Sequence, residues 1–311
     1  MKKLMIAGLL LSSAVQAHVN IDVCGESVSF DKVPTRAVAN DINMLKIMLA
    51  LDLKDNMVGY SGVSAHHNMS DKIVAEVGKL PEIAPKYPTQ ENLLNADADF
   101  YFAGWNYGMQ VGGIMTPKTL AQVGIKTYAI KESCAHVQQR SQVTLEDTFY
   151  DIASIAKIFN VEHKAKRLIE GYQARLAEVK SSLTGITEKR VFVYDSGQDK
   201  PFTSGALAVP NAIIEAAGGR NIMQDIAKSW TRVNWESVVD NNPEHIIIID
   251  YGQPSALEKI AFLKRFPATA DIDAVLNDSF TILSYASATP GIENIDSVEK
   301  LATDLYPEKF N

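Results

Sequence analysis

The feature that most constrains the fold is an amphipathic segment near the middle of the chain, residues 161–183. Apolar residues recur in it at steps of three and four, the spacing of one face of an α-helix: Ala165, Leu168, Ile169, Tyr172, Leu176, Val179 and Leu183. At about 1.5 Å per residue, this segment predicts a helix roughly 35 Å long, enough to cross a small domain. We expect Asn160 to cap its start and a shorter helix, 145–159, to lead into it.

The stretches on either side of this helix resemble each other. Residues 90–104 and 235–250 each hold a glutamate, Glu91 or Glu236, followed by a helical turn, a polar break and an apolar run. Phe100 and His245 each follow their glutamate by nine residues. Continuous apolar runs are typical of parallel strands covered on both faces. Any β/α protein repeats helix, turn and strand, but the matched glutamates favour two lobes related by a pseudo-repeat.

Apolar runs alternate with helical patterns on both sides of the long helix, which predicts an α/β fold. We expect two Rossmann-like lobes with mainly parallel sheets, joined by one long rigid helix. The predicted boundaries are 18–159 for the N-terminal lobe, 160–185 for the connecting helix and 186–311 for the C-terminal lobe. The expected strands are 37–40, 57–60, 99–103, 125–130, 190–194, 245–249 and 280–283.

The N-terminus has the pattern of a secretory signal peptide. Lys2 and Lys3 precede a short apolar run, and small residues end at Ala17, so we expect cleavage of residues 1–17 and export to the periplasm. A buried N-terminal helix is the alternative. Cleavage takes the basic residues from 30 to 28 against 37 acidic ones, a net charge of −9. That charge argues against nucleic acid or an anionic membrane as a partner, and we expect a soluble monomer.

The chain has two cysteines, Cys24 and Cys134. In an oxidising compartment an isolated pair favours a disulfide over a functional site. Such a bridge would tie the N-terminal tail to the end of the first lobe, and two buried free thiols are the alternative. Two cysteines so far apart in sequence do not favour a zinc site.

Aromatic residues recur where the predicted strands end or in the segments between them. Ligands of open α/β sheets bind beyond the carboxyl ends of the strands, so these residues predict a cleft with flat apolar walls. The candidates are Tyr60, Trp105, Tyr107, Tyr194, Trp230, Tyr251 and Tyr285. Arg140 and Arg232 are the best cationic ligand contacts. The alternatives are half-buried rim aromatics and surface ion pairs.

Other chemistry has weaker support. His66, His67 and His136 provide imidazoles that could hold a bare metal ion, but adjacent histidines in a polar segment are more often solvated. The chain contains no Gly-x-Ser-x-Gly, no Gly-x-Gly-x-x-Gly, no phosphate loop and no His-Glu-x-x-His, the signatures of several common enzyme classes. We therefore expect a binding protein with neither a catalytic site nor a cofactor, and a secreted α/β enzyme is the alternative.

Several segments resemble the periplasmic solute-binding proteins that serve ABC importers of ferric siderophores, haem and cobalamin. The resemblance covers nearly all of the chain after residue 17 and depends on the order and spacing of these segments. They are Val33-Pro34-Thr35-Arg36, the helix-to-strand passage 51–60, the Glu91 unit, the long middle helix, residues 215–222 with their paired glycines, and Trp235-Glu236 leading to Asn242-Pro243.

The resemblance implies a ligand held between two α/β lobes that open only slightly. It also implies that one glutamate on each lobe, here Glu91 and Glu236, contacts basic residues of an inner-membrane ABC permease. Exposed carboxylates at helix starts are the alternative. We expect the ligand to be an iron(III)–siderophore chelate, with haem, a corrinoid, another bulky solute or a bare metal ion as alternatives.

Overall fold

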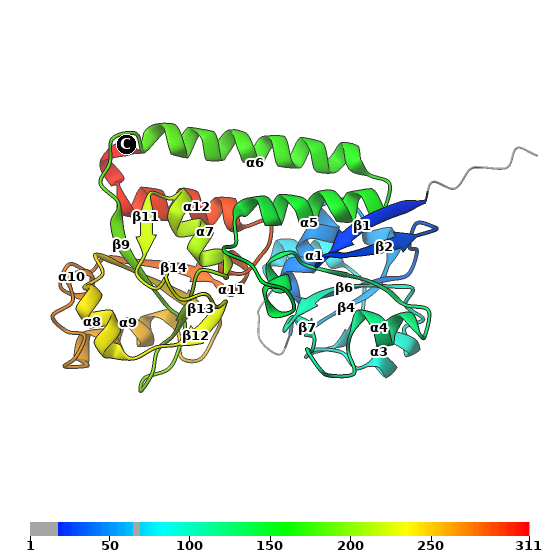
Figure 1. Ribbon diagram of the computed structural model, residues 1–311, viewed down its shortest axis with the longest axis horizontal. Coiled ribbons are helices and arrows are strands. Elements are labelled where there is room, and N and C mark those ends of the chain that lie inside the picture. Colours follow the sequence, from blue (N-terminus) through cyan, green and yellow to red (C-terminus); the bar gives the residue numbers. More distant parts are fainter. Residues whose placement is uncertain (1–17, 65–68, 311) are drawn as a thin grey trace, which may run out of the picture.

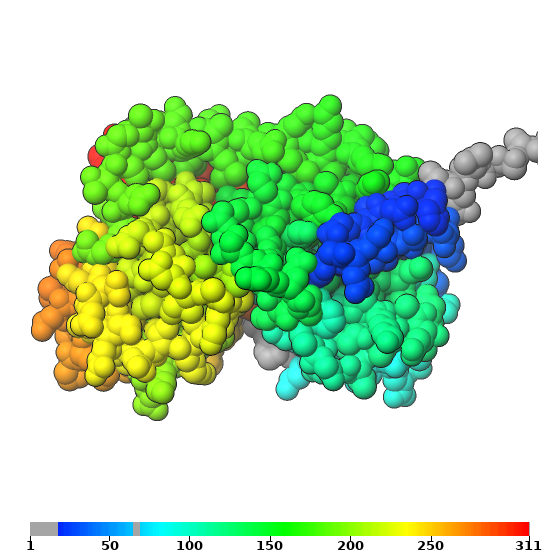
Figure 2. Space-filling model, in the orientation of Figure 1, coloured from blue at the N-terminus to red at the C-terminus, as the bar shows by residue number. Residues whose placement is uncertain are grey.

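The computed structural model describes residues 18–64 and 69–310 and shows two α/β lobes beneath one long helix (Figure 1). The helix, α6 (Glu162–Ser182), runs across the top of both lobes. In the space-filling view a notch separates the lobes on the side away from α6 (Figure 2). The predicted fold class, two lobes with largely parallel sheets and one long connecting helix, is confirmed.

The N-terminal lobe contains a parallel sheet in the order β5-β4-β3-β6-β7, with β8 also paired to β6. An antiparallel hairpin, β1 with β2, precedes it; the sequence analysis did not predict this hairpin. The strands are β1 Val19–Val23, β2 Glu26–Phe30, β3 Ala37–Asn40, β4 Met57–Ser61, β5 Glu82–Ala84, β6 Phe100–Trp105, β7 Gly108–Met109 and β8 Lys126–Ala129. The helices are α1 Asp41–Ala50, η1 Lys54–Asn56, α2 Asp71–Val77, α3 Gln90–Asn95, α4 Pro117–Ala121, η2 Glu132–His136 and α5 Leu145–Ile158.

The C-terminal lobe contains a four-stranded parallel sheet in the order β11-β9-β13-β14 and a small antiparallel pair, β10 with β12. The strands are β9 Lys189–Tyr194, β10 Phe202–Ser204, β11 Gly219–Asn221, β12 Trp230–Arg232, β13 His245–Asp250 and β14 Phe280–Ser284. The helices are α7 Val209–Ala216, α8 Trp235–Asn241, α9 Ala256–Arg265, α10 Asp273–Leu276, α11 Tyr285–Ala288, α12 Asn294–Leu305 and η3 Pro307–Lys309.

The main sheet of the C-terminal lobe is buried on both faces, as its continuous apolar strands predict. Side chains of a strand alternate between faces, so Val191 and Val193 join one hydrophobic cluster and Phe192 and Tyr194 join another. The same alternation divides β13. This pattern decides which strand residues are available to a ligand and which are part of the core.

The long helix α6 is confirmed, and it packs on both lobes. Ile169 and Tyr172 contact the hydrophobic cluster of the N-terminal lobe and one of the two clusters of the C-terminal lobe. The expected cap at Asn160 is wrong: Val161 is the N-cap residue and makes no side-chain capping hydrogen bond. Asn160 instead takes a positive φ of 57°, which directs the chain from α5 into α6, a conformation that asparagine tolerates.

Helix α5 also bridges the lobes, which the sequence analysis did not predict. Leu145 and Phe149 near its start lie in a cluster of the C-terminal lobe, whereas Ile152 and Ile155 lie in the N-terminal cluster. Two adjacent helices therefore contact both lobes. Packing along a pair of helices limits relative motion more than a single connection would.

The predicted disulfide is confirmed. Cys24, in the turn of the β1–β2 hairpin, is bonded to Cys134 in η2. The residues of the predicted signal peptide, 1–17, lie outside the described residues, as do His66 and His67. Within residues 18–64 and 69–310, no helix combines the length and the apolar character needed to cross a membrane.

Candidate ligand-binding site

A central cavity of about 290 Å³ lies between the lobes. Its lining comes from loops and strand ends of both lobes. The N-terminal lobe provides Tyr87, Asn106, Tyr107 and His136, and the C-terminal lobe provides Asp195, Phe202, Ser229, Trp230, Ile249, Tyr285, Ala288 and Thr289. This is the position that open α/β sheets use for ligands, beyond the carboxyl ends of their strands.

Two further cavities adjoin the central one, and together the three form what we call the cleft. A side cavity of about 270 Å³ shares Tyr87, Asp195, Phe202 and Tyr285 with it. An outer cavity of about 840 Å³ shares Tyr251 and Tyr285 with the side cavity. The cleft thus extends from an aromatic centre to a wider and more polar opening.

A tight turn after β6 presents Tyr107 to the central cavity. The backbone groups of Gly104 and Tyr107 exchange two hydrogen bonds of 2.9 Å. Asn106 and Gly108, on either side of Tyr107, have positive φ values of 65° and 97°. A Cβ at position 108 would lie 2.3 Å from the Tyr101 hydroxyl oxygen, so only glycine fits there.

The C-terminal wall is built on the β10–β12 pair. Ser204 is opposite Trp230 in the register of that pair, and the rings of Phe202 and Trp230 stack with centroids 5.8 Å apart. Tyr285 begins α11, whose N-cap residue Ser284 accepts a hydrogen bond from the backbone N–H of Ser287. These local structures hold the three rings at the cavity.

Direct contacts across the cleft join the lobes. The Tyr285 hydroxyl donates to Asp41 Oδ2 at 2.8 Å, and the Ser229 hydroxyl donates to Glu132 Oε1 at 3.3 Å. Tyr107 and Trp230, which come from opposite lobes, both line the central cavity.

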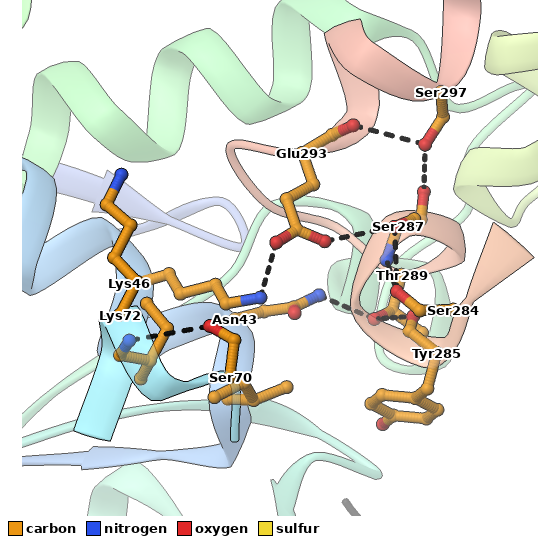
Figure 3. A network of polar contacts seen from close by, with 12 residues as sticks. Asn43, Lys46, Ser70, Lys72, Ser284, Tyr285, Ser287, Thr289, Glu293 and Ser297 are labelled. Carbon is orange, nitrogen blue, oxygen red and sulfur yellow. Dashed lines mark hydrogen bonds and ion pairs between the residues drawn. The ribbon is translucent and has the colours of Figure 1, made fainter. Parts of the chain in front are cut away.

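A second set of contacts joins α1 to the segment before α12, as Figure 3 shows. Lys46 pairs with Glu293, and Glu293 accepts a hydrogen bond from the Ser287 hydroxyl at 3.0 Å. The Asn43 amide donates to Pro290 O at 3.0 Å and also to the Thr289 hydroxyl. In the described conformation, the two lobes are therefore joined by these contacts as well as by the Tyr285–Asp41 hydrogen bond.

Burial shapes the ionisation of the acidic groups at the lobe interface. Desolvation raises the pKa of Asp41 to about 6 and that of Glu132 to about 8. Burial also raises the pKa of Asp195, against hydrogen bonding from Tyr251 and the opposing effect of Lys259. The pKa of His136 is lowered by burial, so its imidazole is neutral at pH 7.

Four of the predicted ligand-binding residues meet at the cleft. Tyr107, Trp230 and Tyr285 line the central cavity, and Tyr251 lines the side and outer cavities. The Tyr251 hydroxyl donates to Asp195 Oδ2 at 2.9 Å, and the rings of Tyr251 and Tyr285 make an edge-to-face contact at 6.5 Å. Their role in binding stays a prediction.

The structure places the other three predicted aromatics away from the cleft lining. Tyr60 and Tyr194 are 6% and 2% exposed and belong to the hydrophobic cores. Tyr194 packs against Trp235 and Phe262, because the last residue of β9 still follows the alternation of its strand. Trp105 is half-buried against the N-terminal core.

Neither predicted arginine lines the cleft. Arg140 Nη2 donates to both Asp147 carboxylate oxygens at 2.7 Å, and Arg140 Nη1 donates to Lys131 O. This arrangement ties the start of α5 to the segment before it. Arg140 thus forms an ion pair, which was the alternative to a ligand contact. Arg232 is exposed and donates to Lys200 O, and its guanidinium carbon lies 5.4 Å from the centre of the Phe202 ring.

Tyr87 and Phe202 were missed as cleft residues. Tyr87 lies in the loop before α3, donates from its hydroxyl to Asn106 O at 3.1 Å and lines both inner cavities. Both residues adjoin a proline, Pro88 and Pro201, and neither has a periodic pattern that would place it. The two residues share one sequence signal, an aromatic residue directly beside a proline.

Metal ligation lacks a preformed site in the described part of the chain. Residues 18–64 and 69–310 contain no group of three or more His, Cys, Asp or Glu side chains placed to hold a metal ion. His136 lies beside Asn106, with their nitrogens 3.3 Å apart. The possible contribution of His66 and His67 falls on residues that are not described.

Glu91 and Glu236 occupy matching places in the two lobes. Each is exposed and lies in the first turn of a short helix, α3 or α8. Both helices lie on the side of their lobes away from α6 (Figure 1). The apolar residues three positions further along, Leu94 and Val239, are 47% and 37% exposed, so each helix presents a carboxylate beside an apolar side chain.

Comparison with known proteins agrees with this architecture. Residues 38–284 match a family model described as periplasmic binding protein. A periplasmic binding protein from Veillonella parvula is similar, with 26% identity, a TM-score of 0.81 and coverage of 93% of this chain and 98% of that one. An ABC-type Fe3+-hydroxamate transport system structure from Saccharomonospora viridis has 19% identity, a TM-score of 0.79 and coverage of 92% and 98%. A periplasmic haem-binding protein from Vibrio cholerae has 20% identity, a TM-score of 0.68 and coverage of 88% and 99%.

Proposed function

This chain belongs to the periplasmic binding protein family, and from that premise we propose that it captures an iron(III)–siderophore chelate in the periplasm. It then delivers the chelate to an ABC importer in the inner membrane. The observation that carries the proposal is the aromatic cleft between the lobes, formed by Tyr107, Trp230, Tyr251 and Tyr285. The function is capture and release, without bond chemistry.

The size of the cleft supports a bulky ligand. The central cavity alone is near the lower end of small-molecule sites. The side and outer cavities continue it towards solvent. A chelate with a compact iron centre and a larger organic frame would occupy all three, with its apolar parts against the aromatic rings.

Delivery requires a surface that a permease recognises. Glu91 with Leu94 and Glu236 with Val239 form two matching contact points, one on each lobe. A carboxylate beside an apolar side chain fits a basic partner residue in an apolar setting, and charge complementarity of this kind sets orientation and association rate. One contact on each lobe would also make docking sensitive to the relative position of the lobes.

Haem is the second candidate, and the tyrosines and His136 in the cavity lining support it. Tyrosine and histidine side chains are both axial ligands of haem iron. The His136 imidazole is in the neutral form that binds metals, because its pKa is lowered by burial. The two candidates differ in their optical spectra, so a single preparation can separate them.

The decisive experiment is titration of the purified protein with ferric siderophores, haem and cobalamin, followed by tryptophan fluorescence and melting temperature. Trp230 lines the cavity, whereas Trp105 and Trp235 do not, so Trp230→Phe should abolish most of the quenching and Trp105→Phe should leave it. A broad visible band from bound ferric chelate supports the first candidate, and a sharp Soret band supports haem. If no ferric siderophore changes the fluorescence or the melting temperature, the proposed ligand is wrong.

A further inference from the structure

The central cavity has the composition of an aromatic cage for a cation. Its lining includes five aromatic side chains and one carboxylate: Tyr87, Tyr107, Phe202, Trp230, Tyr285 and Asp195. Aromatic faces attract cations within about 6 Å of the ring centre, and quaternary ammonium groups are recognised by cages of such rings. The carboxylate adds a direct counter-charge at the edge of the rings.

The residues that are described as lining the central and side cavities provide no positively charged side chain. None of the residues that line the central or side cavity is Lys or Arg. His136, the one basic side chain in the central lining, is neutral at pH 7 because burial lowers its pKa. The side cavity adds a second carboxylate, Asp41. An anionic group would therefore meet carboxylates and ring faces without a cationic partner in the wall.

Two cations lie just outside this lining, and the positive charge of each partly offsets the effect of burial on the pKa of Asp195. Lys259 donates to Ile249 O at 2.6 Å and lies 4.4 Å from the centre of the Tyr251 ring. Arg232 donates to Lys200 O and covers the Phe202 ring from the rim. Each already makes a cation–π contact with a ring of the cleft. Rings of the cleft thus already pack against positive charge, and Tyr87, Tyr107, Trp230 and Tyr285 line the central cavity without a lysine or arginine beside them in its lining.

We propose that the central cavity seats a cationic nitrogen of the ligand, a protonated or quaternary amine, with Asp195 as its counter-charge. This inference deepens the proposed function, because it selects ferric chelates that carry such a group and no net negative charge. Three hydroxamates neutralise iron(III), so a tris-hydroxamate with a pendent amine is a cation. Three catecholates leave a charge of 3−, and a chelate of that class would be excluded.

The test compares two chelates that differ only in this charge. Ferrioxamine B carries a free ammonium at the end of its chain, and its N-acetyl derivative does not. By calorimetry, the ammonium form should bind about tenfold to a hundredfold more tightly, the range of one charge-assisted contact. Asp195→Asn should remove the difference, whereas Asp225→Asn, an exposed carboxylate of the same lobe, should preserve it. Equal or tighter binding of the N-acetyl form would overturn the inference and leave the siderophore function standing.

A second pair of probes makes the result independent of the siderophore. Choline and its neutral isostere 3,3-dimethylbutanol test the cage alone, and Phe202→Leu tests the ring contribution if Asp195→Asn fails to fold. If the chelates do not bind but choline does, in preference to the neutral isostere and less well in Phe202→Leu, the cation site stands and the proposed ligand falls. If neither chelates nor choline bind in preference to their uncharged partners, the inference is wrong.

Discussion

Tyr285 donates its hydroxyl to Asp41 Oδ2 across the two lobes at 2.8 Å, although 244 positions separate the two residues in the chain. Asp41 begins α1 and is 2% exposed. Its carboxylate also accepts from the backbone N–H of Ile42, and these hydrogen bonds oppose the burial that raises its pKa to about 6. The contact therefore links the ionisation of the Asp41 carboxyl to the position of the C-terminal lobe, which carries Tyr285.

Tyr285→Phe should lower the free energy of unfolding at neutral pH by about 1–3 kcal/mol, because a buried carboxylate loses one donor. It should also raise the pKa of Asp41 further, since the Tyr285 hydrogen bond holds that pKa down. Urea unfolding measures the first effect. Tyr150→Phe is the matched control, because the Tyr150 hydroxyl donates to a backbone oxygen at an exposed site. Equal losses in both variants would contradict a special role for the interlobe bond.

Glu132→Gln should flatten the pH dependence of stability. Burial raises the pKa of Glu132 from 4.5 to about 8 in the folded protein, so the folded state binds this proton more tightly than the unfolded chain. The stabilisation is complete below the unfolded pKa and is lost as pH rises through the folded one, a window from about 4.5 to about 8. The buried Oε2 atom has no hydrogen-bond partner among residues 18–64 and 69–310, which agrees with a neutral carboxyl.

The measurement is urea unfolding of wild type and variant at about pH 5 and about pH 9. Relative to wild type, Glu132→Gln should gain on the order of a few kcal/mol between the two conditions. Glu236→Gln, which changes an exposed carboxylate, controls for the general effect of removing a charge. A constant difference between wild type and Glu132→Gln across this range would show that Glu132 does not titrate there.

Removing the disulfide should destabilise the N-terminal lobe. The Cys24–Cys134 bond closes a loop with a sequence separation of 110, and loops of this length correspond to about 4–5 kcal/mol in the chain-entropy treatment. The Cys24→Ser, Cys134→Ser double variant should therefore melt at a lower temperature than wild type. Reductant should lower the melting temperature of wild type and leave that of the variant unchanged. Insensitivity of wild type to complete reduction would show that the hairpin docks without the bond.

Glu91→Ala with Glu236→Ala should reduce uptake while leaving ligand affinity unchanged, because both residues lie on helices outside the cleft lining. The measurements are calorimetric affinity for the ligand and transport in vesicles that contain the permease. Glu178→Ala, an exposed glutamate on α6, is the control on the opposite side of the molecule. A large loss of ligand affinity in the double variant would contradict a docking role.

Periodicity in the sequence was enough to predict α5, α6 and most central strands, because each follows from the local requirement to bury one face. The apolar run of β13 and the three-and-four spacing of α6 are examples. The β1–β2 hairpin was not predicted, since its strands are short, with several exposed positions. The disulfide followed from compartment and cysteine number.

Contacts between segments far apart in the chain determine which residues line the cleft, and the sequence could not predict those contacts. Tyr194 and Tyr251 both follow apolar runs, yet one is buried beneath Trp235 and the other lines the cleft. Tyr87 lies in a loop and Phe202 begins the three-residue strand β10, and neither has a repeat long enough to predict the direction of its side chain. The sequence by itself determined two parallel sheets and a long helix, because burial has a local period. Only the tertiary structure decided which rings face the gap, because that depends on strand pleat, loop path and the packing of one lobe against the other.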